Sequence, residues 1–282
     1  MSTWVAVRCE ECGGSVASPI GAPPACMFCG ATRSCLEQEE IPEDVEQPDK
    51  FVPFAVDRDG ASEQFRKFAR SSFWYPTSIR NAPLQLQMLL LPAWALSAVV
   101  EMHWTGLTPA HTSSGSRPVS GSESLRWTEV LIPASSSLRA AELRQLGVFA
   151  RETMQEWDPE THETPFELSE MTRTAAETKG RGEMERRHKA RVKKAEGLTR
   201  VRTACLVTEM TGELALVPVF IGTYRYKNHP YRFLVNGQTG KLIGTAPTDW
   251  LKVFAVVGLT LLLILGLLGA TVLFTAICGA VS

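Results

Sequence analysis

Apolar residues are distributed unevenly along the chain, and the longest uninterrupted apolar run lies at its C-terminal end. Residues 253–281 contain no charged side chain and no proline. About 20 helical residues cross the hydrocarbon core of a bilayer, so this run is long enough to span it with some tilt. An isolated segment in lipid must satisfy its own backbone, which predicts a transmembrane helix. A buried core helix is the alternative, but such helices seldom extend this far without a charge.

The residues around this run predict its orientation. Lys241 and Lys252 precede it, and Trp250 stands where an interfacial aromatic residue is expected. The first residues lack the apolar core of a signal peptide, and the apolar segment 88–100 is short and interrupted by Pro92. We therefore expect a single-pass protein of the inner, cytoplasmic membrane, with its N-terminal bulk in the cytosol.

Between residues 51 and 249 the apolar positions switch between helical and strand periodicity, which predicts one β-rich α+β domain. Helical spacing predicts helices at 59–70, 137–146 and 183–196. Alternating or continuous apolar runs predict strands at 87–100, 101–107, 127–132, 214–226, 231–235 and 241–244, of which the last three form a β-meander. Segments 109–124 and 158–170 have no apolar stripe and are expected to be irregular.

Two segments of this domain admit a binding interpretation. The aromatic residues of 73–76 could stack nucleic-acid bases, but no basic residues interleave with them, so we expect them in the core. The basic run in 183–196 could contact anionic lipid or nucleic acid. Glutamates lie among its cations, which favours a solvated helix with i,i+4 ion pairs and an inner stripe of Met184, Val192 and Ala195.

The N-terminal residues carry a metal-site spacing. Cys9, Cys12, Cys26 and Cys29 form the pattern C-x2-C-x13-C-x2-C, with a glycine after each pair. Two cysteines separated by two residues reach one ion from one tight turn, and four thiolates close a tetrahedral Zn²⁺ site with no position for water. Two disulfides or an iron–sulfur cluster are alternatives, but disulfides are disfavoured in the cytosol. We therefore predict one structural zinc per chain.

The remaining cysteines fall outside this spacing. We interpret Cys35, Cys205 and Cys278 as small apolar residues, with Cys35 as a replacement ligand being the less favoured alternative. The segment after the ribbon is acidic and contains two prolines, which is typical of an extended linker that uncouples the ribbon from the domain. Binding of a basic partner is the less favoured alternative, because runs of charge are usually solvated. The predicted order is a zinc ribbon (1–35), an acidic linker (36–50), a cytosolic α+β domain (51–249) and a transmembrane tail anchor (250–282).

Several motifs occur together in a known architecture. They are the four-cysteine ribbon, the segments 51–54, 90–94 and 130–134, the hairpin 224–241 and the following span. The chain resembles bacterial single-pass membrane proteins with a zinc ribbon of the transcription-factor-IIB type, which are sometimes mislabelled as primosomal helicases. The chain has no phosphate-binding G-x-x-x-x-G-K-[S/T] motif, so a helicase is not expected. The resemblance implies an adaptor role for a family without a settled biochemical function.

An enzyme is not expected. The histidines His103, His111, His162, His188 and His229 are scattered without metal-ligand spacing, and no hydrolase or dinucleotide motif is present. The net charge of −1 also lacks the basic excess of a dedicated nucleic-acid binder.

Two functions remain. One is a membrane-anchored adaptor that recruits proteins, and the other is a membrane-tethered nucleic-acid binder that uses the ribbon. The ribbon carries Arg8 and Arg33 but also Glu10 and Glu11, which makes a poor phosphate clamp and favours protein recruitment. Within the span, Gly266 and Ala270 form a small-x-x-x-small pair through which a second helix could pack, so self-association through this face is possible.

Overall fold

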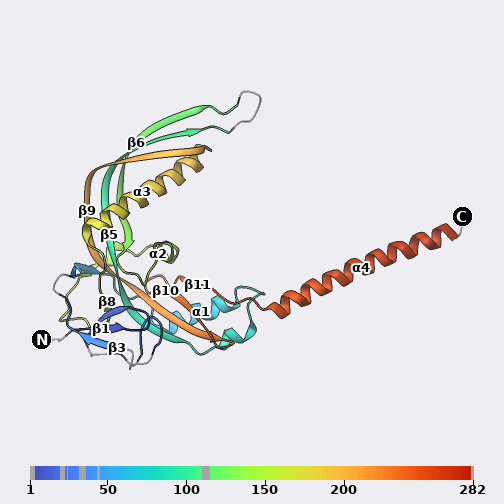
Figure 1. Cartoon of the computed structure of the whole chain (residues 1–282), viewed down its shortest axis with the longest axis horizontal. Coiled ribbons are helices and arrows are strands. Elements are labelled where there is room, and N and C mark those ends of the chain that lie inside the picture. The colour runs from blue at the N-terminus through green and yellow to red at the C-terminus, as the bar shows by residue number, and fades with distance from the viewer. Residues whose placement is uncertain are drawn as a thin grey trace.

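The structure is a computed structural model that describes residues 4–19, 23, 25–31, 36–42, 45–109 and 115–280, with the backbone alone for Arg151 and 268–280. Its frame is a pair of very long antiparallel strands, β5 (Gln85–Leu107) and β9 (Thr199–Tyr226). They pair from Gln85 opposite Thr223 to Leu107 opposite Thr199. Figure 1 shows both strands leaving a globular base and bending into an arm. Strand β6 (Pro118–Pro133) pairs with β5 along this arm.

The bend of the arm coincides with irregularities in strand pairing. The register between β5 and β6 shifts between Leu96 and Ala98, and opposite this shift Glu129 has φ 54°. A second shift lies between Val99 and Val100 on the β9 side. Extra residues at such bulges bend a strand and increase its twist, which accounts for the curvature.

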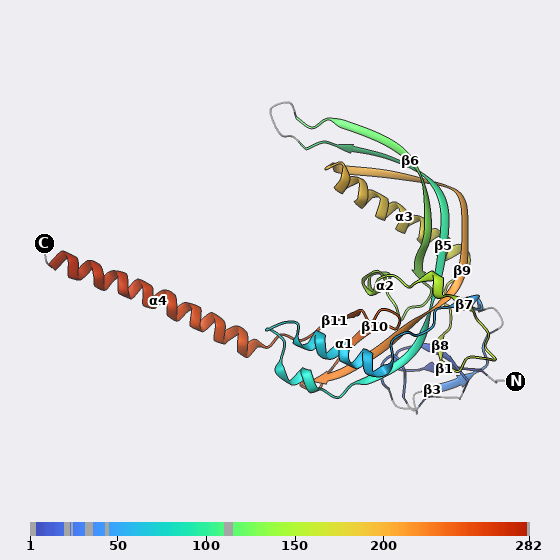
Figure 2. The same ribbon diagram turned by 180° about the vertical axis from the view of Figure 1, so that it is seen from behind.

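Helix α3 (Arg173–Ala195) covers the inner face of the arm (Figures 1 and 2). Its buried residues recur every fourth position, namely Ala176, Gly180, Met184, His188 and Val192. Met184 and Val192 are buried as predicted, whereas Ala195 is exposed at the last residue of the helix. The basic side chains face outward, and Glu183 accepts hydrogen bonds from Arg186 and Arg187. These contacts support the interpretation of a solvated helix.

The base contains the rest of an 11-stranded sheet, in the order β11-β10-β9-β5-β8-β2-β1-β3. Strands β10 (His229–Asn236) and β11 (Leu242–Gly244) follow β9 as successive antiparallel neighbours. On the other side of β5 lie β8 (Phe166–Glu167), β2 (Ser15–Ser18), β1 (Val5–Cys9) and β3 (Leu36–Glu39). Short strands β4 (Lys50–Phe51) and β7 (Gln155–Glu156) pair with each other, and β4 also pairs with β9.

Two helices cover the base. Helix α1 (Arg58–Arg70) begins where Asp57 accepts from the N–H of Gly60 at 2.7 Å, a conventional N-cap. Its face of Ala61, Phe65 and Ala69 is fully buried against aromatic residues of β9 and β10. Helix α2 (Ala140–Leu146) buries Leu143 and Leu146, and the short 3-10 helices η2 (Thr77–Asn81) and η3 (Arg151–Thr153) complete the connections.

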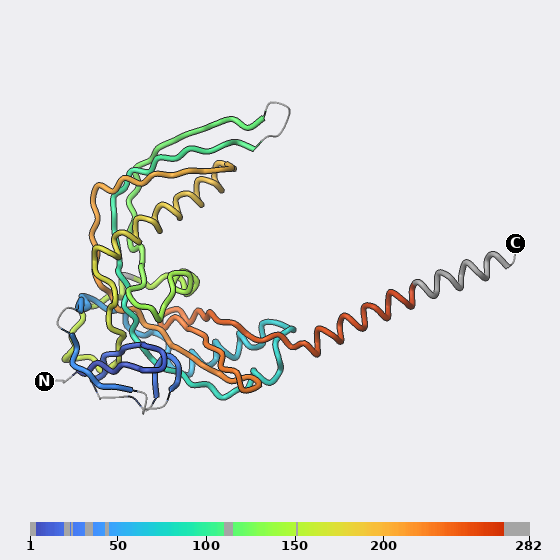
Figure 3. The backbone as a smooth tube through the Cα atoms, viewed as in Figure 1, coloured from blue at the N-terminus to red at the C-terminus, as the bar shows by residue number. Residues whose placement is uncertain are grey.

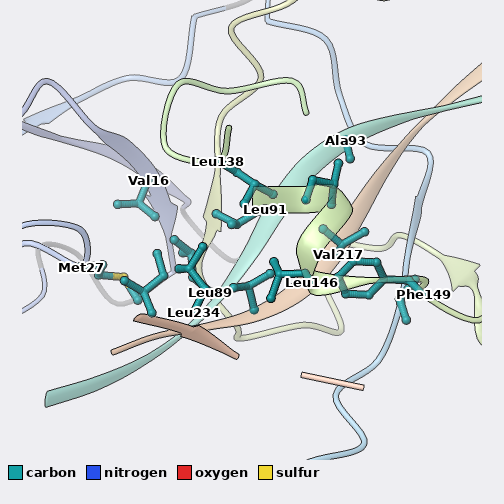
Figure 4. Close-up of a cluster of buried hydrophobic side chains, with 14 residues drawn as sticks. Val16, Met27, Leu89, Leu91, Ala93, Leu138, Leu146, Phe149, Val217 and Leu234 are labelled. Atoms are coloured by element: carbon teal, nitrogen blue, oxygen red, sulfur yellow. The ribbon is translucent and has the colours of Figure 1, made fainter. Parts of the chain in front are cut away.

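The ribbon strands contribute to the same core as the base. Figure 4 shows Val16 and Met27, from the N-terminal segment, in one cluster with Leu89, Leu91 and Leu234 from the central strands. Leu138 and Leu146 close this cluster from the side of α2. Val16 and Met27 of the N-terminal segment are therefore packed into the core of the domain.

Helix α4 (Trp250–Ala280) starts at the base, and its part up to Leu267 extends away from the base, as the coloured tube in Figure 3 shows. The stretch Trp250–Leu267 has the length and composition needed to cross a membrane, and none of it is buried.

Several local predictions are wrong. The segment 109–124 is not all loop, because β6 begins at Pro118, and its side chains alternate between exposed and half-buried, so no apolar stripe marks the strand. The segment 158–170 contains β8, and the segment 36–50 contains β3 and the first residue of β4. The aromatic segment 73–76 is not a core cluster, since Phe73 is 62% and Trp74 42% exposed.

Candidate metal centre

Each cysteine pair lies in a tight turn that the following glycine closes. In the first turn the N–H of Gly13 donates to the carbonyl of Cys9 at 2.8 Å, and in the second the N–H of Gly30 donates to the carbonyl of Cys26 at 3.0 Å. Gly13 has φ +74° and Gly30 has φ +76°. This left-handed backbone favours glycine, which explains the residue that follows each pair.

The two turns bring the four sulfur atoms together. The Sγ atoms of Cys9, Cys12, Cys26 and Cys29 all lie within 4.8 Å of one another. Cys9 is 3.8 Å from Cys29, and Cys12 is 3.7 Å from Cys26. Zn–S bonds of about 2.3 Å in a tetrahedron place the sulfurs about 3.8 Å apart, so the donor set has the size of a metal site. A disulfide needs about 2.05 Å, and all four cysteines are free.

The electrostatics of the cluster favour a bound cation. Burial raises the pKa of the Cys12 and Cys26 thiols above the ordinary value. For Cys9, burial opposes ionisation, but hydrogen bonds from the backbone of Cys12 and Glu11 outweigh it and lower the pKa. Four clustered thiolates repel one another unless a cation lies between them, so deprotonation of the full set is coupled to metal binding.

One side of the cluster is sealed and the other is open. Cys9 and Cys26 are buried, at 1% and 4% exposure, whereas Cys12 and Cys29 are exposed. The site therefore has one buried and one exposed cysteine from each turn. With all four positions filled by sulfur, a bound ion has no open position for water or substrate, so the site is suited to a structural role.

The ribbon is joined to the domain by backbone pairing as well as by packing. Strand β2 pairs with β8, with Val16 opposite Glu167, and β8 in turn pairs with β5 at Leu90. At the N-terminal end, the indole of Trp4 donates to the carbonyl of Pro159 at 2.8 Å. These contacts contradict the expectation that residues 36–50 uncouple the ribbon from the domain. The two-residue strand β8 provides the connection, and it is too short to be recognised in a sequence.

The ribbon also continues beyond its predicted end. Strand β3 pairs antiparallel with β1, with Glu37 opposite Arg8 and Glu39 opposite Ala6. The acidic segment therefore begins as the outermost strand of the ribbon. The three residues that follow Leu36 on this strand are all exposed. The charge that made this segment resemble a linker is instead displayed on a strand.

The other cysteines do not join the cluster. Cys205 lies on β9 at intermediate exposure, and burial raises the pKa of its thiol. Cys35 and the side chain of Cys278 lie outside the described residues.

Within the described part of the chain, no histidine joins a metal-binding group. His188 is buried 3.3 Å from a carboxylate oxygen of Glu123, and His162 stacks on Trp157 with ring centroids 5.0 Å apart. His103 and His229 lie on β5 and β10, and His111 is outside the described residues.

Two polar residues have roles that the sequence did not indicate. Glu167 on β8 is 1% exposed and accepts hydrogen bonds from the hydroxyls of Ser135, at 2.5 Å, and Ser137. Lys252, which the sequence predicts as a cytoplasmic flanking cation, also donates from its Nζ to the carbonyls of Phe73, at 3.0 Å, and Tyr75, at 2.6 Å. Lys252 therefore ties the first turn of α4 to the base.

The packing positions predicted in the span are only partly described. An added Cβ at Gly266 would meet nothing within 4 Å among the described residues. The side chain of Ala270 lies outside the described residues. Comparison of the chain with family models, with curated proteins and with solved structures found no match.

Proposed function

We propose that this chain is a membrane-anchored zinc-ribbon adaptor that recruits or scaffolds cytosolic or membrane proteins and has no catalytic turnover of its own. Three features support the proposal: the four-sulfur cluster, the apolar helix α4 and the acidic outer surface of the ribbon. Membership of the bacterial zinc-ribbon membrane proteins that the sequence resembles is part of the same proposal.

The ion is proposed to be Zn²⁺, bound by Cys9, Cys12, Cys26 and Cys29 at one site per chain. Zinc accepts four thiolates in a tetrahedron without preference for another geometry, and the cysteine spacing is that of zinc ribbons. Its contribution is to folding, because the short ribbon strands bury little apolar surface of their own.

Helix α4 is proposed to anchor the protein in the cytoplasmic membrane, with the base and arm in the cytosol. The support is that Lys241 precedes the helix and Lys252 lies in its first turn, before the charge-free run, and positive charge marks the cytoplasmic side. Self-association through Gly266 and Ala270 would add a second copy without involving the ribbon.

The observation that carries the recruitment proposal is the charge of the exposed ribbon surface. Exposed Glu10 and Glu11 follow β1, and exposed Glu37 and Glu39 lie on β3, beside the single cation Arg8 among the described ribbon residues. A surface of this sign repels phosphates and attracts basic segments of proteins. We propose that the ribbon binds a basic protein segment, and that nucleic acid is not its ligand.

A charge reversal on β3 tests this proposal. Full-length protein is cross-linked in membranes, purified in detergent and analysed by quantitative mass spectrometry, with the double variant Glu37→Lys, Glu39→Lys beside the wild type. Glu209→Lys, on an exposed position of β9 in the arm, is the matched control. The proposal predicts proteins that are recovered with the wild type and the control and lost with the double variant. Equal recovery in all three, or recovered material that nuclease removes, contradicts it.

A further inference from the structure

Four exposed aromatic side chains lie around the start of α4. Phe73 and Trp74 belong to the loop after α1, and Trp250 and Phe254 belong to the first turns of α4. Phe73 is 62%, Trp250 65% and Phe254 67% exposed. Their rings form two neighbouring pairs, with centroids 5.3 Å apart for Phe73 and Trp74 and 6.1 Å apart for Trp250 and Phe254.

The loop is held at this place by hydrogen bonds to the start of the helix. The N–H of Asp249 donates to the carbonyl of Trp74 at 2.8 Å. Lys252 donates to the carbonyls on either side, those of Phe73 and Tyr75, and its Nζ lies 5.4 Å from the centroid of the Phe73 ring. The loop therefore cannot move along the helix without breaking these bonds, so Phe73 and Trp74 stay beside its first turn.

The loop is also fixed from the side of the domain. Tyr75 packs against Phe68 of α1 with ring centroids 5.5 Å apart, and Pro76 and Ile79 are buried. Phe73 and Trp74, which directly precede Tyr75, are exposed. Two adjacent large aromatic residues are held in solvent by a supported loop, although burying them would release water from apolar surface.

We propose that Phe73 and Trp74 are a second membrane contact, in which their rings enter the headgroup region of the bilayer beside α4. The proposal rests on the membrane anchoring by α4 proposed above. Aromatic rings favour this depth, because an apolar body is buried while the polar edge of an indole stays in contact with water. The two rings contact lipid rather than a protein, because the loop is hydrogen-bonded to Asp249 and Lys252, where the apolar helix begins.

This contact has a consequence for the whole molecule. One helix on its own allows the cytosolic part to tilt and rotate about the membrane normal. A second contact on one side of α4 restricts that rotation and holds the base in one orientation over the bilayer. The ribbon, at the opposite side of the base from α4 in Figures 1 and 2, is then kept away from the lipid.

Site-specific photo-cross-linking separates this proposal from the anchoring on which it rests. A diazirine amino acid is placed at position 74 of the full-length protein, reconstituted in vesicles of phosphatidylcholine and phosphatidylglycerol. Position 257, within α4, is the control for anchoring, and position 38, on β3, is the control for a cytosolic surface. Lipid adducts are identified by mass spectrometry after irradiation.

The proposal predicts lipid adducts at positions 74 and 257 and none at position 38. Adducts at 257 without adducts at 74 overturn the second contact and leave the anchor intact, whereas no adducts at 257 overturn both. A Lys252→Met variant adds a test of positioning, because it removes the side-chain donor to the loop and leaves only the hydrogen bond from the N–H of Asp249. The lipid adduct at position 74 should then fall while that at 257 is unchanged, and Lys252→Arg should restore part of it. An undiminished adduct at 74 in Lys252→Met contradicts the positioning role of Lys252.

Discussion

The ring of Phe28 lies against the Cα of Gly14, where an added Cβ would meet the ring atom Cδ2 at 2.4 Å. Gly14 follows the first cysteine turn, and Phe28 lies within the second. The two turns are thus held together by a contact that only glycine permits, independently of any metal. The backbone N–H of Phe28 also donates to the sulfur of Cys26 at 3.4 Å, so displacing Phe28 disturbs a ligand.

Replacing Gly14 by alanine should therefore destabilise the ribbon. The ring of Phe28 must move by more than a few tenths of an ångström, and overpacking of this kind costs about 1–3 kcal/mol. We expect a lower unfolding temperature and a faster transfer of zinc to a chelator than in the wild type. Equal rates of transfer in Gly14→Ala and wild type would show that the contact does not support the site.

Loss of the metal ligands should weaken the base as well as the ribbon. In the double variant Cys9→Ser, Cys12→Ser the first turn loses its metal, and with it the support for Val16 and Met27 in the central core. We expect less than one zinc per chain by elemental analysis, and earlier exchange of β5 amides in hydrogen-exchange mass spectrometry. If the variant loses zinc but its β5 amides keep wild-type protection, the result supports the sequence-based prediction that the ribbon folds independently of the domain.

Glu167 should make stability depend on pH. Burial, opposed by hydrogen bonds from Ser135 and Ser137, raises the pKa of this carboxyl from 4.5 to about 7. Between these values the folded protein binds more protons than the unfolded chain, so stability is highest at the acidic end and falls as pH rises. Between pH 6 and pH 8.5 we expect a loss of about 1 kcal/mol, measured by denaturant unfolding of the zinc-loaded protein.

A glutamine at this position isolates the effect. Glu167→Gln keeps hydrogen-bonding atoms between the two serines but cannot ionise, so the fall in stability above pH 6 should disappear. Glu163→Gln is the control, because Glu163 is exposed and lies outside the hydrogen bonds of Glu167. The same pH dependence in Glu167→Gln and in wild type would exclude Glu167 as its source.

Two glycines of α3 should respond oppositely to alanine. At Gly182 an added Cβ meets nothing within 4 Å, so Gly182→Ala should stabilise the helix by about 1 kcal/mol. At Gly180 the Cβ would lie 2.3 Å from Leu96, whose other methyl faces Gly212 and cannot retreat, so Gly180→Ala should destabilise the arm by about 1–3 kcal/mol. Thermal unfolding of the two variants provides the comparison, and equal shifts would contradict the packing of α3 on β5.

Local sequence patterns predicted the helices and metal-binding turns that are formed by residues close together in the sequence. The cysteine spacing placed four sulfurs together, the helical face of Ala61 and Phe65 identified α1, and the charge-free run identified α4. Each of these three features depends on residues that are close in the sequence, so their spacing alone indicates which side chains share one site or one helix face.

Long-range pairing could not be predicted in the same way. Strand β8 has two residues, yet it joins the ribbon to the sheet, and nothing in Phe166 or Glu167 distinguishes them from a loop. The outer half of β6 carries polar residues on both faces, so its pairing with β5 left no periodic signal. The exposed position of Phe73 and Trp74 also escaped prediction, because an aromatic cluster has the same composition in a core and at a bilayer surface.

The central claim is that the acidic surface of the ribbon binds a protein while α4 holds the chain in the membrane. The most direct test is photo-cross-linking in intact cells from position 38 on β3, with position 209 on the arm as control and with nuclease treatment before analysis. The account predicts a discrete protein adduct at position 38 that resists nuclease, disappears in Glu37→Lys, Glu39→Lys and is absent at position 209. No protein adduct at position 38, or an adduct there that nuclease removes, would contradict it.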